Sequence, residues 1–121
     1  MPNRLNIFDW LVHGGHQYEF FKLNHNFYCT GKNGKAPIYK DLGRPKNKNV
    51  KFVNEQYFLN NNSNIIMIRS SVPHHKLDAI RKKTNGVGIA VMQTHTPFSP
   101  PPWTRCIVWN SKVSMDRFKK Q

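Results

Sequence analysis

Two short runs of consecutive apolar residues constrain the fold of this chain more than any other feature. Residues 65–68 read IIMI and residues 87–92 read VGIAVM, and neither run alternates with polar positions. A strand with both faces buried carries such a run, whereas a strand with one face in water alternates. Strands of this kind occur mainly in parallel sheets covered by helices on both faces, so the runs favour an α/β fold.

Further strands and helices are predicted on either side of these runs. The expected strands lie at 5–12, 26–30, 50–54, 65–68, 87–92 and 106–109. Three helices are expected: one at 17–24, one that begins at a Ser70-Ser71 cap and ends at Asn85-Gly86, and one at 112–120. Strands and helices alternate through most of this order. It predicts a Rossmann-like fold, with a largely parallel sheet flanked by helices. The length of 121 residues suits a single domain covering residues 1–121.

Two segments are predicted to be loops. Residues 32–49 are rich in Gly, Pro, Asn and Lys, and four of the seven residues from 96 to 102 are proline, which excludes a helix or a central strand there. The basic loop either serves solubility alone or contacts phosphate groups, and the sequence leaves both possibilities open. Its candidate polyanion-binding residues are Lys32, Lys35, Lys40, Arg44, Lys46 and Lys48.

The charge of the chain favours polyanionic partners. Lys and Arg number 19 against six acidic residues, a formal net charge of +13. Nucleic acid, phosphorylated glycans and an anionic membrane surface are all consistent with this charge. The sequence lacks both an apolar run of about 20 residues and a signal-peptide pattern, so we expect no transmembrane segment and a cytoplasmic location. Cys29 and Cys106 lie in apolar runs, where reduced core thiols are expected and a buried disulfide is the alternative.

The carboxyl ends of the predicted strands are where a ligand site is expected. Parallel strands bring these ends to one edge of the sheet, and loops that enter helices there offer free N–H groups and a favourable dipole to anions. The loops at this edge are His13-Gly14-Gly15-His16, Ser70-Ser71, Gln93-Thr94-His95 and Asn110-Ser111. The candidate substrate-binding residues are Gly14, Gly15, His16, Ser70, Ser71, Thr94, His95, Trp103, Asn110 and Ser111, with Trp103 as a stacking residue.

The HGGH segment is the most specific local feature. His13 or His16 could act as a general base, because imidazole titrates near neutral pH, and either could equally be a capping or core histidine. The segment matches no dinucleotide or ATP motif. The six histidines do not combine with a carboxylate or thiol at ligand spacing, so no metal site is predicted. Asp9, four residues before His13, either orients an imidazole or is an ordinary buried aspartate.

The opening LNIFDWLVHGGHQYEFFKLNHNFYCTG resembles the N-terminal domain of GT-B-type glycosyltransferases, in which a similar HG…Y…H-x-F-Y opening occurs. The later segments VGIAVMQTH, TPFSPPPW and CIVWNSKVSMDRFKK are similar to later strands and loops of that domain. The motifs are short and degenerate, and together they span nearly the whole chain.

The resemblance implies a Rossmann-like domain that binds the acceptor of a sugar transfer. His13 would deprotonate an acceptor hydroxyl, Gly14 and Gly15 would line the cleft, and His95 would lie opposite. The donor would be a nucleotide-sugar held by a second domain, and neither a bound metal nor another cofactor is implied. Because the sequence ends at Gln121 without a donor motif, we expect it to need a partner chain or further domain for activity. The alternative is a basic module that binds nucleic acid or another polyanion without catalysis.

Overall fold

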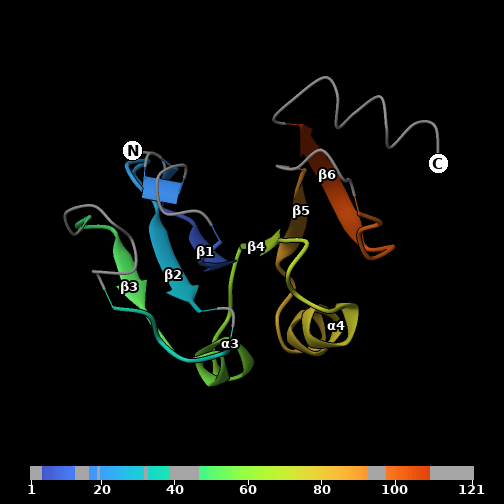
Figure 1. Ribbon diagram of the computed structural model, residues 1–121, viewed down its shortest axis with the longest axis horizontal. Coiled ribbons are helices and arrows are strands. Elements are labelled where there is room, and N and C mark those ends of the chain that lie inside the picture. Colours follow the sequence, from blue (N-terminus) through green and yellow to red (C-terminus); the bar gives the residue numbers. More distant parts are fainter. Residues whose placement is uncertain are drawn as a thin grey trace.

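The fold is organised around one six-stranded sheet whose strands all run parallel (Figure 1). The computed structural model describes residues 4–12, 17–18, 20–31, 33–38, 47–92 and 98–109. The strands are β1 (Asn6–Trp10), β2 (Asn26–Thr30), β3 (Val50–Phe52), β4 (Ile65–Ile68), β5 (Val87–Met92) and β6 (Thr104–Trp109). The prediction of a Rossmann-like α/β fold is confirmed, and the sheet is parallel throughout rather than in large part.

The strand order β3-β2-β1-β4-β5-β6 places a topological switch point at the centre of the sheet. Ile7 of β1 lies opposite Phe27 of β2 on one side and Ile65 of β4 on the other. The chain therefore builds outward in one direction from β1 and then in the opposite direction from β4. In sheets of this order, ligands bind outside the carboxyl ends of the two strands that flank this point.

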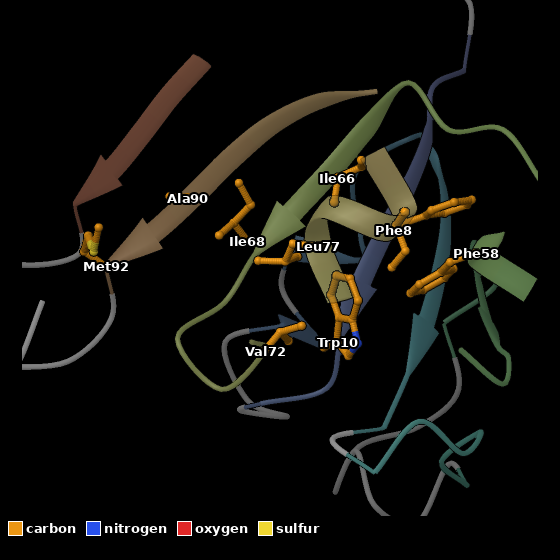
Figure 2. Packing of buried hydrophobic residues seen from close by; sticks show 10 residues of the cluster. Phe8, Trp10, Phe58, Ile66, Ile68, Val72, Leu77, Ala90 and Met92 are labelled. Carbon is orange, nitrogen blue, oxygen red and sulfur yellow. The ribbon is translucent and has the colours of Figure 1, made fainter. Parts of the chain in front are cut away.

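Within the described residues, two helices cover the first face of the sheet. Helices α3 (Gln56–Asn60) and α4 (His74–Lys83) lie next to each other on the same side in Figure 1. Phe58 of α3 stacks on Phe8 of β1 with ring centroids 4.3 Å apart, and Leu77 of α4 is fully buried in the same cluster (Figure 2). The buried even-numbered residues of the central strands meet these helices, because side chains alternate between the faces of a strand.

The second face carries a separate apolar cluster over β1 and β2. Phe20 and Phe21, from the segment that follows β1, pack on Phe27 of β2 with ring centroids 5.0 and 5.2 Å apart. Gln17, Tyr18 and Phe20 are helical, whereas residues 21–24 form turns and bends, so the helix expected at 17–24 ends earlier than predicted. Apolar residues thus bury both faces of the sheet, as the runs in the sequence predict.

The structure corrects three details of the sequence interpretation. Helix α4 begins at His74, and neither Ser70 nor Ser71 caps it: Pro73 is the N-cap in an extended conformation, and no side chain bonds the helix start. Helix α3 is missing from the sequence prediction, because five residues are too few to show helical periodicity. Cys29 is a buried free thiol as expected, whereas Cys106 is an exposed free thiol on β6.

The two predicted loops contain no helix or strand in their described parts. Of residues 32–49, the structure describes 33–38 and 47–49, and of residues 96–102 it describes 98–102. The helix expected at 112–120 lies outside the described residues.

Candidate functional site at the carboxyl edge of the sheet

A buried ion pair joins the two strands at the switch point. Arg69, the residue after β4, donates from Nε to Oδ1 of Asp9 and from Nη2 to Oδ2, both at 2.9 Å. The Asp9 side chain is fully buried, and that of Arg69 is 4% exposed. Two parallel hydrogen bonds between charged groups fix both position and orientation. The pair therefore locks the carboxyl ends of β1 and β4 together.

The side chain of Gln17 bonds the segment after β1 back to the end of that strand. Its Oε1 accepts from the backbone N–H of Val12 at 2.7 Å, and its Nε2 donates to the carbonyl of Trp10 at 2.7 Å and to Oδ2 of Asp9 at 3.0 Å. One side chain thereby ties the helical segment that contains Gln17 to the end of β1. Val12 and Gln17, the described residues on either side of the HGGH segment, are therefore hydrogen-bonded to each other.

Burial and charge at this edge alter two ionisable groups. Burial by itself would lower the pKa of Arg69, but the charge of Asp9 and the hydrogen bonds to it raise that pKa above its ordinary value. Burial, and secondarily the charge of Asp9, raises the pKa of the Cys29 thiol well above its ordinary value. Arg69 is therefore a permanent cation, and Cys29 is a protonated thiol with no nucleophilic character at neutral pH.

Asp9 is a fully buried aspartate that is hydrogen-bonded to the described residues around it. Each of its oxygens accepts two hydrogen bonds: Oδ1 from the Trp10 amide and Arg69, and Oδ2 from Gln17 and Arg69. These bonds hold the frame of the site, because they join the end of β1 to Gln17 and Arg69.

The structure brings some of the sequence-predicted residues together and separates another from them. Ser70 and Ser71 lie exposed in the turn after β4, beside the end of β1. Trp103 lies at the opposite edge, directly before β6, where its Nε1 donates to Oδ1 of Asp78 at 2.7 Å and its ring packs against Gly88. The remaining candidates at this edge lie outside the described residues: His13, Gly14, Gly15, His16, Thr94, His95, Asn110 and Ser111.

A basic cavity lies at the amino-terminal edge of the sheet. It has a volume of about 240 Å³, and its cationic lining residues are Arg4, Lys48 and Lys51. Arg4 donates to the Oδ1 atoms of Asn24 and Asn26, which orients its guanidinium group. No acidic residue is among the described residues that line this cavity. Of the six candidates for polyanion binding, Lys48 lies here and Lys35 is exposed elsewhere, and Lys32, Lys40, Arg44 and Lys46 lie outside the described residues.

Sequence reasoning missed the two residues that build the frame of the carboxyl edge, Arg69 and Gln17. A signal for Arg69 exists: it directly follows the apolar run 65–68, and Asp9 is the one acidic residue within the apolar run 5–12. Charges of opposite sign at the ends of two buried strands are rarely left unpaired, because an isolated buried charge is costly. The hydrogen bonds of Gln17 have no comparable signal in the sequence.

Comparison of the chain with models of protein families, with curated proteins and with solved structures finds no match. Within the described part of the chain, no group of three or more His, Cys, Asp or Glu side chains is arranged to hold a metal ion. The described helices also include none with the length and apolar character needed to cross a bilayer.

Proposed function

We propose that this chain is the acceptor-binding domain of a GT-B-type glycosyltransferase. The observation that carries the proposal is the strand order, in which the carboxyl ends of β1 and β4 lie side by side at a switch point. The HGGH segment follows β1 and the Ser70-Ser71 turn follows β4, so the segment with the strongest family resemblance begins where a ligand is expected.

Each residue of this edge has a defined role in the proposal. His13 is the general base that removes a proton from an acceptor hydroxyl, and the exposed hydroxyls of Ser70 and Ser71 bind other hydroxyls of the acceptor. Gln17 and the Asp9–Arg69 pair hold the surrounding backbone in place. A nucleotide-sugar donor would be bound by a further domain or a partner chain, which would complete the cleft from the other side.

Binding to an array of immobilised oligosaccharides, some of them phosphorylated, tests the proposal on this chain. We expect a defined group of glycans to bind, and the double variant Ser70→Ala, Ser71→Ala and the single variant His13→Ala to bind them at least about tenfold more weakly, as the loss of hydrogen bonds requires. Asn62→Ala, which alters an exposed polar residue before β4 at the opposite edge, is the matched control and should bind normally.

Two results would contradict this function. One is the absence of binding to any glycan; the other is binding that the three substitutions at the carboxyl edge leave unchanged. Nucleotide-sugars provide a second check, since a ligand that binds the folded state raises the melting temperature. We expect no such increase with this chain alone, because the proposal assigns the donor site elsewhere.

A second candidate function, binding of a polyanion, is favoured by the basic cavity at the amino-terminal edge. Arg4, Lys48 and Lys51 converge on it without an acidic residue among the described residues that line it. Each phosphate contact would add about 0.9 to the slope of log affinity against log salt concentration for duplex DNA. Lys48→Gln and Lys51→Gln should each lower this slope, and Lys82→Gln, on the exposed side of α4, should not. Salt-independent affinity would exclude this function and leave the first one untouched.

A further inference from the structure

The basic cavity at the amino-terminal edge is smaller than most sites that hold a complete small molecule. Its volume is about 240 Å³. Sites for whole ligands usually have volumes of about 300–1,000 Å³. Three cationic side chains line the cavity: Arg4 from the segment before β1, Lys48 from the segment before β3, and Lys51 from β3 itself. A space of this size and charge suits one anionic group and the atoms next to it.

The described acidic residues do not balance the charge of this cavity. Each of the three contacts a partner elsewhere in the fold: Asp9 contacts Arg69, Glu55 lies beside Lys76, and Asp78 accepts a hydrogen bond from Trp103. None of these carboxylates forms an ion pair with Lys48 or Lys51. An anion that enters the cavity therefore competes with no described carboxylate for its cations.

Hydrogen bonds hold part of the cavity lining in place before any ligand binds. The guanidinium group of Arg4 donates to Oδ1 of Asn24 at 2.8 Å and to Oδ1 of Asn26 at 3.3 Å. Asn49 donates from Nδ2 to the carbonyl of Leu23 at 2.9 Å. The acceptors of Arg4 are neutral amide oxygens, so its charge is oriented without being neutralised. Side chains that are already ordered lose less entropy when a ligand binds.

We propose that this cavity binds a terminal phosphate monoester. This group has three free oxygen atoms, one for each of the three cations, and it carries a charge of about −1.5 to −2 near pH 7. A phosphodiester within a nucleic acid carries one negative charge and continues as a chain on both sides. The terminal group therefore interacts more strongly with the cations and can enter a small cavity from one side. This inference rests on the second candidate function, because it names the ligand of the same cavity.

Isothermal titration calorimetry of the full chain with two versions of one short single-stranded oligonucleotide tests this site. One version ends in a 5′-phosphate and the other in a 5′-hydroxyl. We expect the phosphorylated version to bind at least about tenfold more tightly, which is the contribution of one charge-assisted hydrogen bond. Arg4→Gln and Lys51→Gln should each reduce this preference, and Lys82→Gln on α4 should leave it unchanged. All three positions are exposed, so we expect the variants to fold like the wild type.

Ribose 5-phosphate and ribose distinguish two sources of the phosphate group. If ribose 5-phosphate binds as tightly as the phosphorylated oligonucleotide, the ligand is a small phosphate ester. If it binds more weakly than the oligonucleotide but more tightly than ribose, the ligand is the phosphorylated end of a nucleic acid. Both results support a terminal phosphate monoester.

Three results would overturn the inference, and they differ in what they leave standing. Equal, salt-dependent binding of the two oligonucleotides would refute the terminal phosphate but leave the polyanion function in place. A preference for the 5′-phosphate that Arg4→Gln and Lys51→Gln both retain would place the site outside this cavity. Absence of salt-dependent binding by every ligand would refute the inference together with the second candidate function.

Discussion

Replacing Arg69 by Met isolates the energetic contribution of the buried ion pair. The substitution keeps an unbranched side chain but leaves the Asp9 carboxylate buried without a cation beside it. It also removes two hydrogen bonds, each 2.9 Å long. Removing one partner of a buried pair costs about 3–5 kcal/mol. This corresponds to a decrease of roughly two to three and a half orders of magnitude in the folding equilibrium constant, at about 1.4 kcal/mol per tenfold change. For a domain with a stability of about 5–15 kcal/mol, such a loss is a large fraction of the total.

Urea unfolding followed by tryptophan fluorescence measures this loss, and the partly exposed pair Lys76–Glu55 supplies the control. The Lys76 Nζ lies 3.5 Å from Oε2 of Glu55, and the side chains are 35% and 21% exposed. Lys76→Met should cost less than about 1 kcal/mol, as surface pairs do. If Arg69→Met cost no more than Lys76→Met, the claim that the pair locks β1 to β4 would be wrong. The double variant Asp9→Leu, Arg69→Met should recover much of the loss, because it removes both charges.

Three further predictions concern individual contacts. Gln17→Ala should lower the free energy of unfolding by about 1–3 kcal/mol because it removes a buried partner of three groups; a urea-unfolding midpoint unchanged from wild type would contradict this. Ellman's reagent should modify Cys106 rapidly in the folded chain and Cys29 only after denaturation, since Cys29 is buried and its pKa is raised; two equally fast thiols would refute the assignment. Gly88→Ala should cost about 1–3 kcal/mol in the same unfolding assay, because a Cβ there would lie 2.6 Å from the Trp103 ring; Trp103→Leu in the same background should relieve part of the cost.

The sequence predicts the sheet well because buried parallel strands have a distinctive local pattern. The strands at 26–30, 65–68 and 87–92 begin and end where the sequence analysis expects them. The runs IIMI and VGIAVM succeed because their side chains pack against apolar clusters on both faces of the sheet, although Val87 at the start of β5 is 43% exposed. Strand β1 ends at Trp10 and β3 at Phe52, two residues earlier than expected in each case, because strand pairing rather than hydrophobicity sets the ends.

The frame of the candidate site could be predicted only in part. The location at the carboxyl edge follows from the parallel arrangement, which also predicts that Ser70 and Ser71 lie there. The contact between Arg69 and Asp9 could not be predicted, because the two residues are 60 positions apart in the sequence. They meet only because the strand order places β4 next to β1, and the sequence pattern does not reveal that order. Trp103, a predicted ligand-binding residue, lies at the amino-terminal edge, where the close approach of Gly88 allows its ring to pack.

The central position of β1 also governs how this chain folds. β1 pairs with β2 through residues about 20 positions apart in sequence, but its other edge stays unpaired until β4, some 58 positions further along than Ile7, has been added. Pairings of such long range require the closure of large loops, and the entropy lost in that closure comes before the stabilisation from the new contacts. Parallel sheets therefore form slowly compared with helical bundles of equal length. Until β4 pairs with it, the backbone N–H and C=O groups along this edge of β1 are open to pairing with other chains. Refolding at high protein concentration should therefore lose more material to aggregation than refolding at low concentration, and substitutions in β4 should worsen that loss more than substitutions in β3.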